Sequence, residues 1–196
     1  MRITGGIARG IQLKAPKGAH TRPATDRFRE TIFSSISSNI KDALCIDLFA
    51  GTGSYGLEAL SRGAKYCLFI ENNPQAISCL KSNQEAVAKS AQLAPNAMQL
   101  SRLNLMQGSA DLRRETSLQE TLKADFIFLD PPYELLKSEA SYILDQLADR
   151  FANPKTKLIL ELPSDLIIQS TQWNEFKRIG ASGRCKPSVA FFERIN

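Results

Sequence analysis

The sequence predicts an α/β fold with a doubly wound, mostly parallel sheet. Apolar runs of strand length alternate with segments of helical periodicity between residues 43 and 162. The first run, residues 43–49, leads directly into a glycine-rich turn and a helix, the order in which nucleotide-binding α/β folds begin. The last two runs, residues 176–179 and 189–195, flank glycines and a proline. They predict an antiparallel C-terminal hairpin that completes a seven-stranded sheet.

The composition limits the class of protein. A chain of 196 residues that is 43% hydrophobic has apolar material for one core but not for two full domains. No stretch reaches the ~18 consecutive apolar residues of a membrane span, and residues 1–6 do not begin a signal peptide, so we expect a cytoplasmic protein without a membrane partner. Four cysteines without a C-x-x-C pair and a single histidine predict neither a metal site nor a disulfide scaffold. No oligomer signal stands out, and we expect a monomer.

The positive charge is concentrated at the N-terminus. Residues 1–30 hold seven Lys and Arg against two Asp and Glu, so 7 − 2 = +5, which equals the net charge of the whole chain. Such a run is often only a solvated surface, but beside a neutral body it favours contact with a polyanion. We expect a basic arm with a small β-hairpin over residues 1–24 and a main domain over residues 25–196. The predicted contacts to the polyanion are Arg2, Arg9, Lys14, Lys17, Arg22 and Arg27.

The remaining elements follow in chain order. Residues 26–39 place apolar side chains at helical spacing behind an N-cap at Thr25 or Asp26, so they predict an amphipathic helix. Residues 90–101 show no firm pattern. Further strands are expected at residues 66–70, 103–107, 126–129 and 158–162. One helix is expected to follow the glycine-rich turn and to end at about residue 62, and further helices are expected at residues 74–89, 118–123 and 138–150.

The turn after the first strand predicts a cofactor cradle. Its glycines let the backbone approach a ligand, and the following helix offers unpaired N–H groups. Glu71 ends the second strand 18 residues after Gly53, the spacing at which a carboxylate binds ribose hydroxyls. Asp47 would repel a pyrophosphate but attract an ammonium group. The two acids therefore match S-adenosylmethionine better than a dinucleotide, and a turn without a ligand is the simpler alternative. The predicted cofactor contacts are Asp47, Phe49, Ala50, Gly51, Thr52, Gly53, Glu71, Asn72, Ser109, Ala110 and Asp130.

The strand at residues 126–129 ends at Asp130-Pro131-Pro132-Tyr133, where a ligand of a parallel sheet would lie. An exocyclic amine on a nucleobase is a poor nucleophile, because its lone pair is delocalised into the ring. The carboxylate of Asp130 and the carbonyl of Pro131 can accept its two N–H hydrogens and stabilise the developing positive charge. The prolines fix these acceptors in place, and Tyr133 can stack on a planar substrate. Asp130, Pro131, Pro132 and Tyr133 are the predicted catalytic residues, and an ordinary proline turn is the alternative.

Together these motifs resemble class I S-adenosylmethionine-dependent methyltransferases that act on exocyclic amino groups. The motifs at residues 2–10, 22–30 and 56–64 narrow the resemblance to the RsmD family of bacterial 16S rRNA guanine-N2 methyltransferases, over essentially the whole chain. The resemblance implies a Rossmann-like class I methyltransferase fold and methylation of guanine N2, at position 966 in the usual rRNA numbering. It also implies RNA contacts for the basic arm, a 30S particle as substrate during small-subunit maturation, and Ser109 and Ala110 at the adenine. Two residues depart from the family pattern: Ile11, where many relatives have a basic residue, and Ser109, where they often have Asp or Asn.

Three other functions remain open from the residues. The same chemistry could serve the N6 amino group of DNA adenine or a protein glutamine, although the connections leave no room for a large DNA-recognition insertion. A nicotinamide-dependent oxidoreductase could use Gly51, Gly53, Gly56 and Glu71, which match the G-x-G-x-x-G pattern. A noncatalytic RNA-binding protein would need only the basic arm.

Overall fold

The computed structural model describes residues 1–16, 26–103, 122–180, 183 and 185–195. The chain divides into two compact units, Met1–Arg102 and Leu103–Asn196. The predicted boundary between a basic arm and a main domain, at residue 24, falls outside the described residues and stays a prediction.

Three parallel strands form the sheet of the first unit. Strand β2 (Tyr66–Ile70) lies between β1 (Leu44–Leu48) and β3 (Met98–Ser101), so the order is β3-β2-β1. Parallel pairing aligns Asp47 with Phe69 in β1 and β2, and Ile70 with Ser101 in β2 and β3. The carboxyl ends of all three strands therefore lie at one edge, where the glycine turn also begins.

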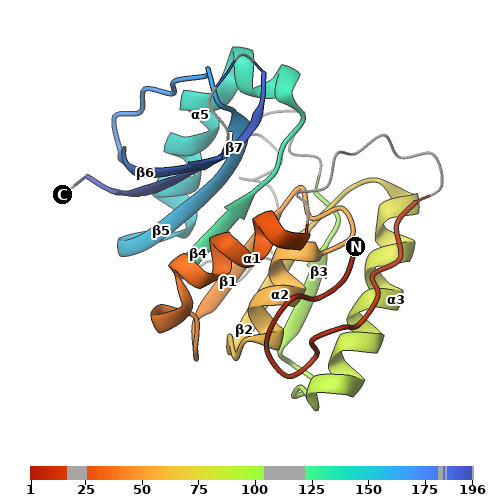
Figure 1. The fold of residues 1–196 in the computed structure, drawn as a ribbon. Helices are drawn as coiled ribbons and strands as arrows, with labels where there is room; N and C mark the ends of the chain where they lie inside the picture. Colours follow the sequence, from red (N-terminus) through yellow and green to blue (C-terminus); the bar gives the residue numbers. More distant parts are fainter. Residues whose placement is uncertain (17–25, 104–121, 181–182, 184, 196) are drawn as a thin grey trace. The chain divides into compact units, whose positions relative to one another are not determined.

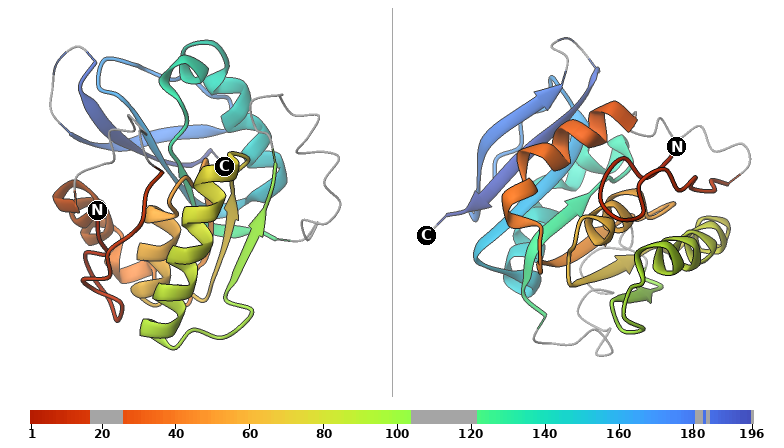
Figure 2. Two further views of the ribbon diagram at one scale, coloured as in Figure 1. Left: turned by 90° about the vertical axis from the view of Figure 1, so that its right-hand side faces the viewer. Right: turned by 60° about the horizontal axis from the view of Figure 1, so that its bottom comes forward.

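Three α-helices belong to the same unit, and α2 (Ser54–Ser61) lies between α1 (Asp26–Ser35) and α3 (Pro74–Ala91) (Figures 1 and 2). A short 3₁₀ helix follows α1 at Ser37–Asn39. Helix α3 begins with proline at its first turn, and the Asn73 side chain accepts hydrogen bonds from the backbone N–H groups of the next turn. All residues of α2 after Ser54 are buried.

The N-terminal segment (residues 1–16) forms a short hairpin that runs beside α2 and α3 (Figure 1). Its two halves meet at an antiparallel bridge between Arg2 and Gln12, and Ile3 exchanges backbone hydrogen bonds with Gly10 and Ile11. The hairpin buries Ile3 completely and Leu13 almost completely. These apolar side chains have no core within the hairpin, so their burial depends on the helices beside it.

The second unit contains four strands in the order β4-β5-β7-β6 and one long helix. Strands β4 and β5 are parallel and are joined by α5, whereas β7 pairs antiparallel with both β5 and β6. The Trp173 indole N–H in β6 donates a hydrogen bond to the Leu144 carbonyl of α5 at 2.7 Å. This bond connects α5 to the C-terminal hairpin of β6 and β7. The bounds are Ala124–Leu129 for β4, Tyr133–Phe151 for α5, Ala152–Pro163 for β5, Trp173–Gly180 for β6 and Pro187–Arg194 for β7.

The structure confirms the predicted α/β class, the parallel pairing and the antiparallel C-terminal hairpin. The predicted third strand at residues 103–107 is wrong in place, because the strand that pairs with β2 is Met98–Ser101, in the stretch without a firm pattern. Most of the predicted strand and of the helix at 118–123 lies outside the described residues. The predicted helix at 138–150 begins earlier, at Tyr133, because the first turn of α5 continues directly from the two prolines.

Gly56 tests how tightly α2 packs on the sheet. A methyl group at this position would lie 2.5 Å from Phe69 Cε1 and 2.6 Å from Cys67 Sγ, both in β2. We therefore expect Gly56→Ala to lower the free energy of unfolding by about 1–3 kcal/mol in urea unfolding, because overpacking forces neighbours apart. Ser78→Ala, at an exposed position of α3, should change it by less than about 0.5 kcal/mol. An equal effect of the two substitutions would contradict the packing argument.

Candidate functional site

The turn between β1 and α2 is held in an unusual backbone conformation. Phe49, Gly51 and Gly53 all have positive φ angles, of 56°, 54° and 79°. This region is costly for a residue with a large side chain, so Phe49 is held there by its surroundings. Ala50 N–H donates to the Ile70 carbonyl at 3.1 Å, and Gly53 N–H donates to the Ala50 carbonyl at 2.6 Å. The turn is thus fixed against the end of β2 before any ligand binds.

Gly53 has a steric reason to be glycine besides its backbone angle. A Cβ atom at this position would lie 2.3 Å from Leu80 Cδ1 of α3. Gly53 is also the N-cap residue of α2, and no side chain of its own can cap the helix. The cap comes from β1, because Asp47 Oδ2 accepts a hydrogen bond from Gly56 N–H at 2.8 Å.

Asp47 is a buried carboxylate, with only 2% of its surface exposed. Burial raises the pKa of Asp47 to about 8, and the charge of Glu71 adds to the increase, while the hydrogen bond from Gly56 lowers it only in part. Among the described residues, only its Oδ2 atom has a hydrogen-bond partner. A cationic group placed beside Asp47 would favour its ionised form, which fits the predicted contact with an ammonium group.

Glu71 is half-buried and accepts three backbone hydrogen bonds. Its Oε2 accepts from Gly51 N–H at 2.8 Å, and its Oε1 accepts from the N–H groups of Asn72 and Asn73 at 2.9 and 2.8 Å. A carboxylate has about four acceptor positions, so part of its capacity remains for a ligand. Glu71 thus joins the glycine turn to the end of β2, and two of the predicted cofactor contacts, Gly51 and Glu71, are in direct contact. Asn72 is exposed beside it, whereas Ser109 and Ala110 lie outside the described residues.

The predicted catalytic motif lies in the second unit, between β4 and α5. Asp130 directly follows β4 and is half-buried, Pro131 is buried, and Pro132 is the N-cap residue of α5. The Pro132 carbonyl accepts from Leu135 N–H at 3.0 Å, so the turn is closed by the helix. Tyr133, which is half-buried, is the first helical residue. The motif is therefore a rigid junction at the carboxyl end of a buried parallel strand.

A buried charged cluster holds the N-terminal segment on α2, and sequence reasoning missed it. Glu58 of α2 is completely buried and accepts hydrogen bonds from Thr4 N–H, Thr4 Oγ1 and Gly5 N–H, each at 2.8 Å. Arg62 Nε donates to the same carboxylate at 2.8 Å, and Arg29 Nε lies 3.5 Å from it. We call Thr4, Gly5, Arg29, Glu58 and Arg62 the Glu58 cluster. An acid in the middle of an otherwise apolar helix was the available sequence signal.

Asn83 of α3 links the N-terminal segment to the glycine turn. Its Oδ1 accepts from Lys14 N–H at 2.8 Å, and its Nδ2 donates to the carbonyls of Lys14 and Thr52, both at 3.0 Å. Only 1% of Asn83 is exposed. A polar residue between Leu80 and Val87 on the apolar face of α3 was the signal for this contact, and the prediction did not use it.

The structure separates the predicted RNA contacts into three groups. Arg2 forms an ion pair with Asp26 at 3.6 Å, and Lys14 Nζ donates to Ser82 at 2.8 Å. Arg9 and Arg27 are exposed, and within the described parts of the chain their guanidinium groups have no recorded ion pair or hydrogen bond. Lys17 and Arg22 lie outside the described residues.

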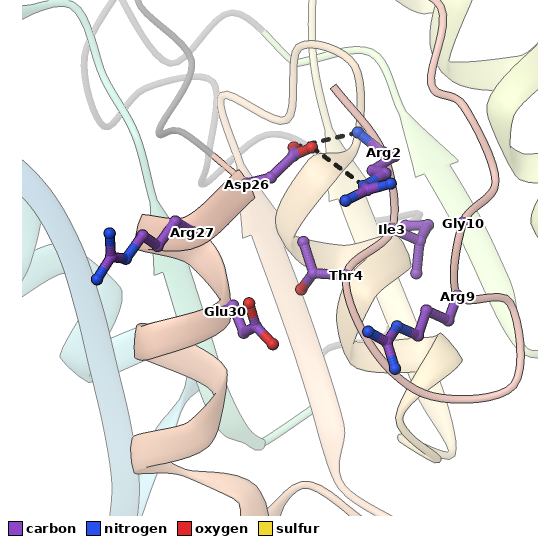
Figure 3. Close-up of a pocket in the computed structure, with 8 residues that line it drawn as sticks. All are labelled: Arg2, Ile3, Thr4, Arg9, Gly10, Asp26, Arg27 and Glu30. Atoms are coloured by element: carbon purple, nitrogen blue, oxygen red, sulfur yellow. Dashed lines mark hydrogen bonds and ion pairs between the residues drawn. The ribbon is translucent and has the colours of Figure 1, made fainter.

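A pocket of about 460 Å³ lies between the hairpin and the start of α1, and we call it the arm pocket (Figure 3). Arg29 Nη2 donates to the Arg2 carbonyl and, at 3.2 Å, to Asp26 Oδ1, so one buried side chain joins both walls. Burial alone would raise the pKa of Asp26, but hydrogen bonds from Arg2 and Arg29 and the charge of Arg29 outweigh it, and the pKa lies below its usual value. The lining residues are Arg2, Ile3, Thr4, Arg9, Gly10, Asp26, Arg27 and Glu30.

The described residues contain no group of three or more His, Cys, Asp and Glu side chains that could hold a metal ion. In the same residues, no helix has the length and apolar character needed to cross a membrane.

Comparison with known proteins identifies relatives along nearly the whole chain. The model of a family described as Conserved hypothetical protein 95 matches residues 1–186. A Bacillus subtilis protein named as an rRNA methyltransferase, YlbH, is 38% identical over 142 residues, which is 71% of this chain and 71% of that protein. Ribosomal RNA small subunit methyltransferase D of Haemophilus influenzae is 31% identical over 178 residues, 90% of this chain and 86% of that protein.

A solved structure gives the same result for the fold. An Escherichia coli chain described as a methyltransferase matches with a TM-score of 0.79 and 27% identity, over 99% of this chain and 97% of that chain. This likeness confirms the predicted Rossmann-like methyltransferase fold.

The raised pKa of Asp47 predicts a pH dependence of stability. The folded pKa of about 8 lies above the ordinary value of 3.8, so between these values the native state holds a proton that the unfolded chain has released. The free energy of unfolding should therefore fall as pH rises, by up to about 1.4 kcal/mol per pH unit from this group. We expect Asp47→Asn to remove that contribution and to be more stable than the unsubstituted protein at about pH 8, measured by urea unfolding across this range.

Asp42→Asn serves as the control for this experiment. Asp42 is exposed, and its φ of 60° suits Asn as well as Asp. Its substitution should leave the pH dependence unchanged. If Asp47→Asn shows the same pH dependence as the unsubstituted protein, Asp47 does not hold the extra proton.

Proposed function

The chain belongs to the family of ribosomal RNA small subunit methyltransferase D, and we propose that it transfers a methyl group from S-adenosylmethionine to the N2 amino group of a guanine in 16S rRNA. The observation that carries the proposal is the Asp130-Pro131-Pro132-Tyr133 junction at the end of a buried strand, combined with a cradle that offers one buried and one half-buried carboxylate. Methylation of rRNA agrees with the names of both relatives.

The cradle of the first unit suits an S-adenosylmethionine molecule. Asp47 would face the ammonium group, the turn from Phe49 to Gly53 would lie along the methionine part, and Glu71 with Asn72 would contact the ribose. Burial strengthens the attraction between Asp47 and a cation, because few water molecules screen it. A dinucleotide fits less well, since its pyrophosphate would meet Asp47 at the same place. This favours methyl transfer over hydride transfer by a nicotinamide enzyme.

The junction of the second unit suits an exocyclic amine. When bound, S-adenosylmethionine supplies a methyl group on a positively charged sulfur. Asp130 and the Pro131 carbonyl would accept the two N–H hydrogens of the amine, so that its lone pair is available for attack and the charge that develops on nitrogen is stabilised. Tyr133 would stack on the base. Because α5 and the prolines hold these groups in place, little reorganisation is needed when the substrate arrives.

The basic arm suits contact with the rRNA backbone. We propose that Arg9 and Arg27 provide exposed charges for phosphates and that Arg2 and Lys14, which are already hydrogen-bonded, contribute mainly to the shape of the arm. The substrate we propose is an assembled 30S particle in the cytoplasm, acted on by a monomer. The proposal also includes the boundary of the arm, which we place at residues 1–24.

Asp130→Ala tests the catalytic assignment. We expect methyl transfer to fall by about 10²–10³-fold or more, because an acceptor that stabilises the transition state is lost. The affinity for S-adenosylmethionine should stay nearly unchanged in a direct binding assay. Glu139→Ala, which removes a carboxylate from α5 beyond the first turn, should retain activity. Full activity of Asp130→Ala would rule out the role assigned to this residue.

The substrate is tested by offering 30S particles and duplex DNA side by side. The particles should come from cells that lack this protein, so that the target base is unmodified. We expect tritiated methyl to appear in the rRNA as N2-methylguanosine after nucleoside analysis. Methylation of the DNA alone would favour the adenine-N6 alternative, and binding without any transfer would favour a noncatalytic RNA-binding protein.

The salt dependence of RNA binding tests the arm. We expect Arg9→Gln and Arg27→Gln each to weaken binding to single-stranded RNA and to reduce the slope of log affinity against log salt by about 0.7, the value for one phosphate contact. Lys89→Gln, at an exposed position of α3, should leave the slope unchanged. An unaltered slope in both arginine variants would mean that the arm does not contact the phosphates.

A further inference from the structure

The arm pocket offers a built recognition site that the proposed chemistry does not use. Its volume of about 460 Å³ lies within the roughly 300–1,000 Å³ of small-ligand sites. Its position is fixed, because the Glu58 cluster holds the hairpin on α2 and Arg29 joins Arg2 to Asp26. The pocket is therefore formed before a ligand arrives, which lowers the cost of ordering it.

Hydrogen bonds and ion pairs already use some of the charged groups in the pocket. Arg2 and Asp26 neutralise each other, and Thr4 is bound to the carboxylate of Glu58. Arg9, Arg27 and Glu30 are exposed, and the described residues provide no recorded partner for their charged groups. The lining residues carry three arginines and two acids, so 3 − 2 = +1. The pocket thus combines a cationic excess with one available carboxylate.

Figure 3 shows Glu30 and Arg9 extending toward each other from opposite sides of the pocket, one from α1 and one from the hairpin, whereas Arg27 is directed away from them. A ligand that lies between the two side chains would meet a cation at one end and a carboxylate at the other. It therefore needs an anionic group and, some distance away, a pair of adjacent hydrogen-bond donors.

Among the four ribonucleotides, guanosine meets this requirement best. The Watson–Crick edge of guanine carries N1–H and N2–H side by side, which match the two oxygens of one carboxylate. Adenine and cytosine have an acceptor beside the amino group, and uracil has acceptors on both sides of its N–H, so a carboxylate would be repelled. Proteins read such edges in unpaired nucleotides of RNA loops.

We propose that the arm pocket is a subsite for an unpaired guanosine of the RNA, distinct from the base that is methylated, with Glu30 on the base edge and Arg9 on the phosphate. The guanosine subsite rests on the proposed function, because that function makes RNA the binding partner. It makes Glu30 a specificity-determining residue and the arm a reader of one nucleotide.

The test measures binding of labelled single-stranded oligouridylate, unmodified or with one central guanosine, adenosine or cytidine, by fluorescence anisotropy. The protein carries Asp130→Ala, so that the proposed active site does not contribute its own preference for guanine. We expect the oligomer with guanosine to bind on the order of tenfold more tightly than the other three. Adding Glu30→Gln should abolish this preference and leave the affinity for plain oligouridylate within about twofold, because only a base contact is lost.

Two further variants complete the design. Arg9→Gln should weaken binding of all four oligomers to a similar extent, since phosphate contacts are independent of sequence. Glu85→Gln removes an exposed carboxylate from α3 and should keep the preference for guanosine. The proposal is overturned if no preference exists, or if it survives Glu30→Gln. Urea unfolding of Glu30→Gln excludes a folding defect, which is not expected at an exposed position.

The result is separable from that of the methyltransferase proposal. If guanosine is preferred through Glu30 but no methyl transfer to 30S particles occurs, the subsite stands and the proposed reaction fails. If 30S particles are methylated but oligomers with guanosine bind no better, the reaction stands and the subsite fails.

Discussion

The buried carboxylate of Glu58 is the interaction on which the first unit depends. An ionised carboxylate loses several kcal/mol of hydration when it is buried, so it must find charges and hydrogen bonds in the protein. Arg62 and Arg29 supply the charges, and three of the hydrogen bonds come from Thr4 and Gly5. The N-terminal hairpin therefore supplies hydrogen bonds without which the Glu58 carboxylate of α2 could not be buried. The hairpin is thus an integral part of the fold of the first unit and not a loose extension.

The same helices that hold the hairpin also hold the cradle. Helix α2 carries Glu58 in its middle, and at its beginning the Gly56 N–H donates a hydrogen bond to Asp47. On α3, the amide of Asn83 bonds to Lys14 of the hairpin and to Thr52 of the glycine turn. The N-terminal hairpin and the cradle are thus linked in two places, through α2 and through Asn83. A shift of the hairpin would therefore move the glycine turn at which the cofactor is proposed to bind.

The sequence was informative where a residue type has one local structural role, such as glycine in a tight turn or proline before a helix. The order of strand, glycine turn and helix, with an acid directly after the second strand, was predicted correctly, and the two prolines correctly predicted a turn at the end of β4. The role of these residues in binding a cofactor and a substrate stays a proposal. The sequence was less informative where a polar residue occupies an apolar stripe. Arg29 stands at the spacing of Ile32 and Phe33, and all three are buried, but periodicity counts only apolar side chains and passes over the arginine. Strand β3 was misplaced because it is short and only its last residue is buried, so its residues show no continuous apolar run.

The two acids of the cradle differ in how completely the protein satisfies them. Glu71 accepts three backbone N–H groups and is partly exposed to water, so its charge is stabilised without a ligand. Asp47 is buried with one such hydrogen bond, and its pKa is raised to about 8. A cation bound at Asp47 would supply the missing stabilisation and, below that pH, would displace a proton. In the proposed function, Asp47 would therefore contribute to recognition of the ammonium group because the fold leaves its charge uncompensated, whereas Glu71 would contribute through geometry that already exists.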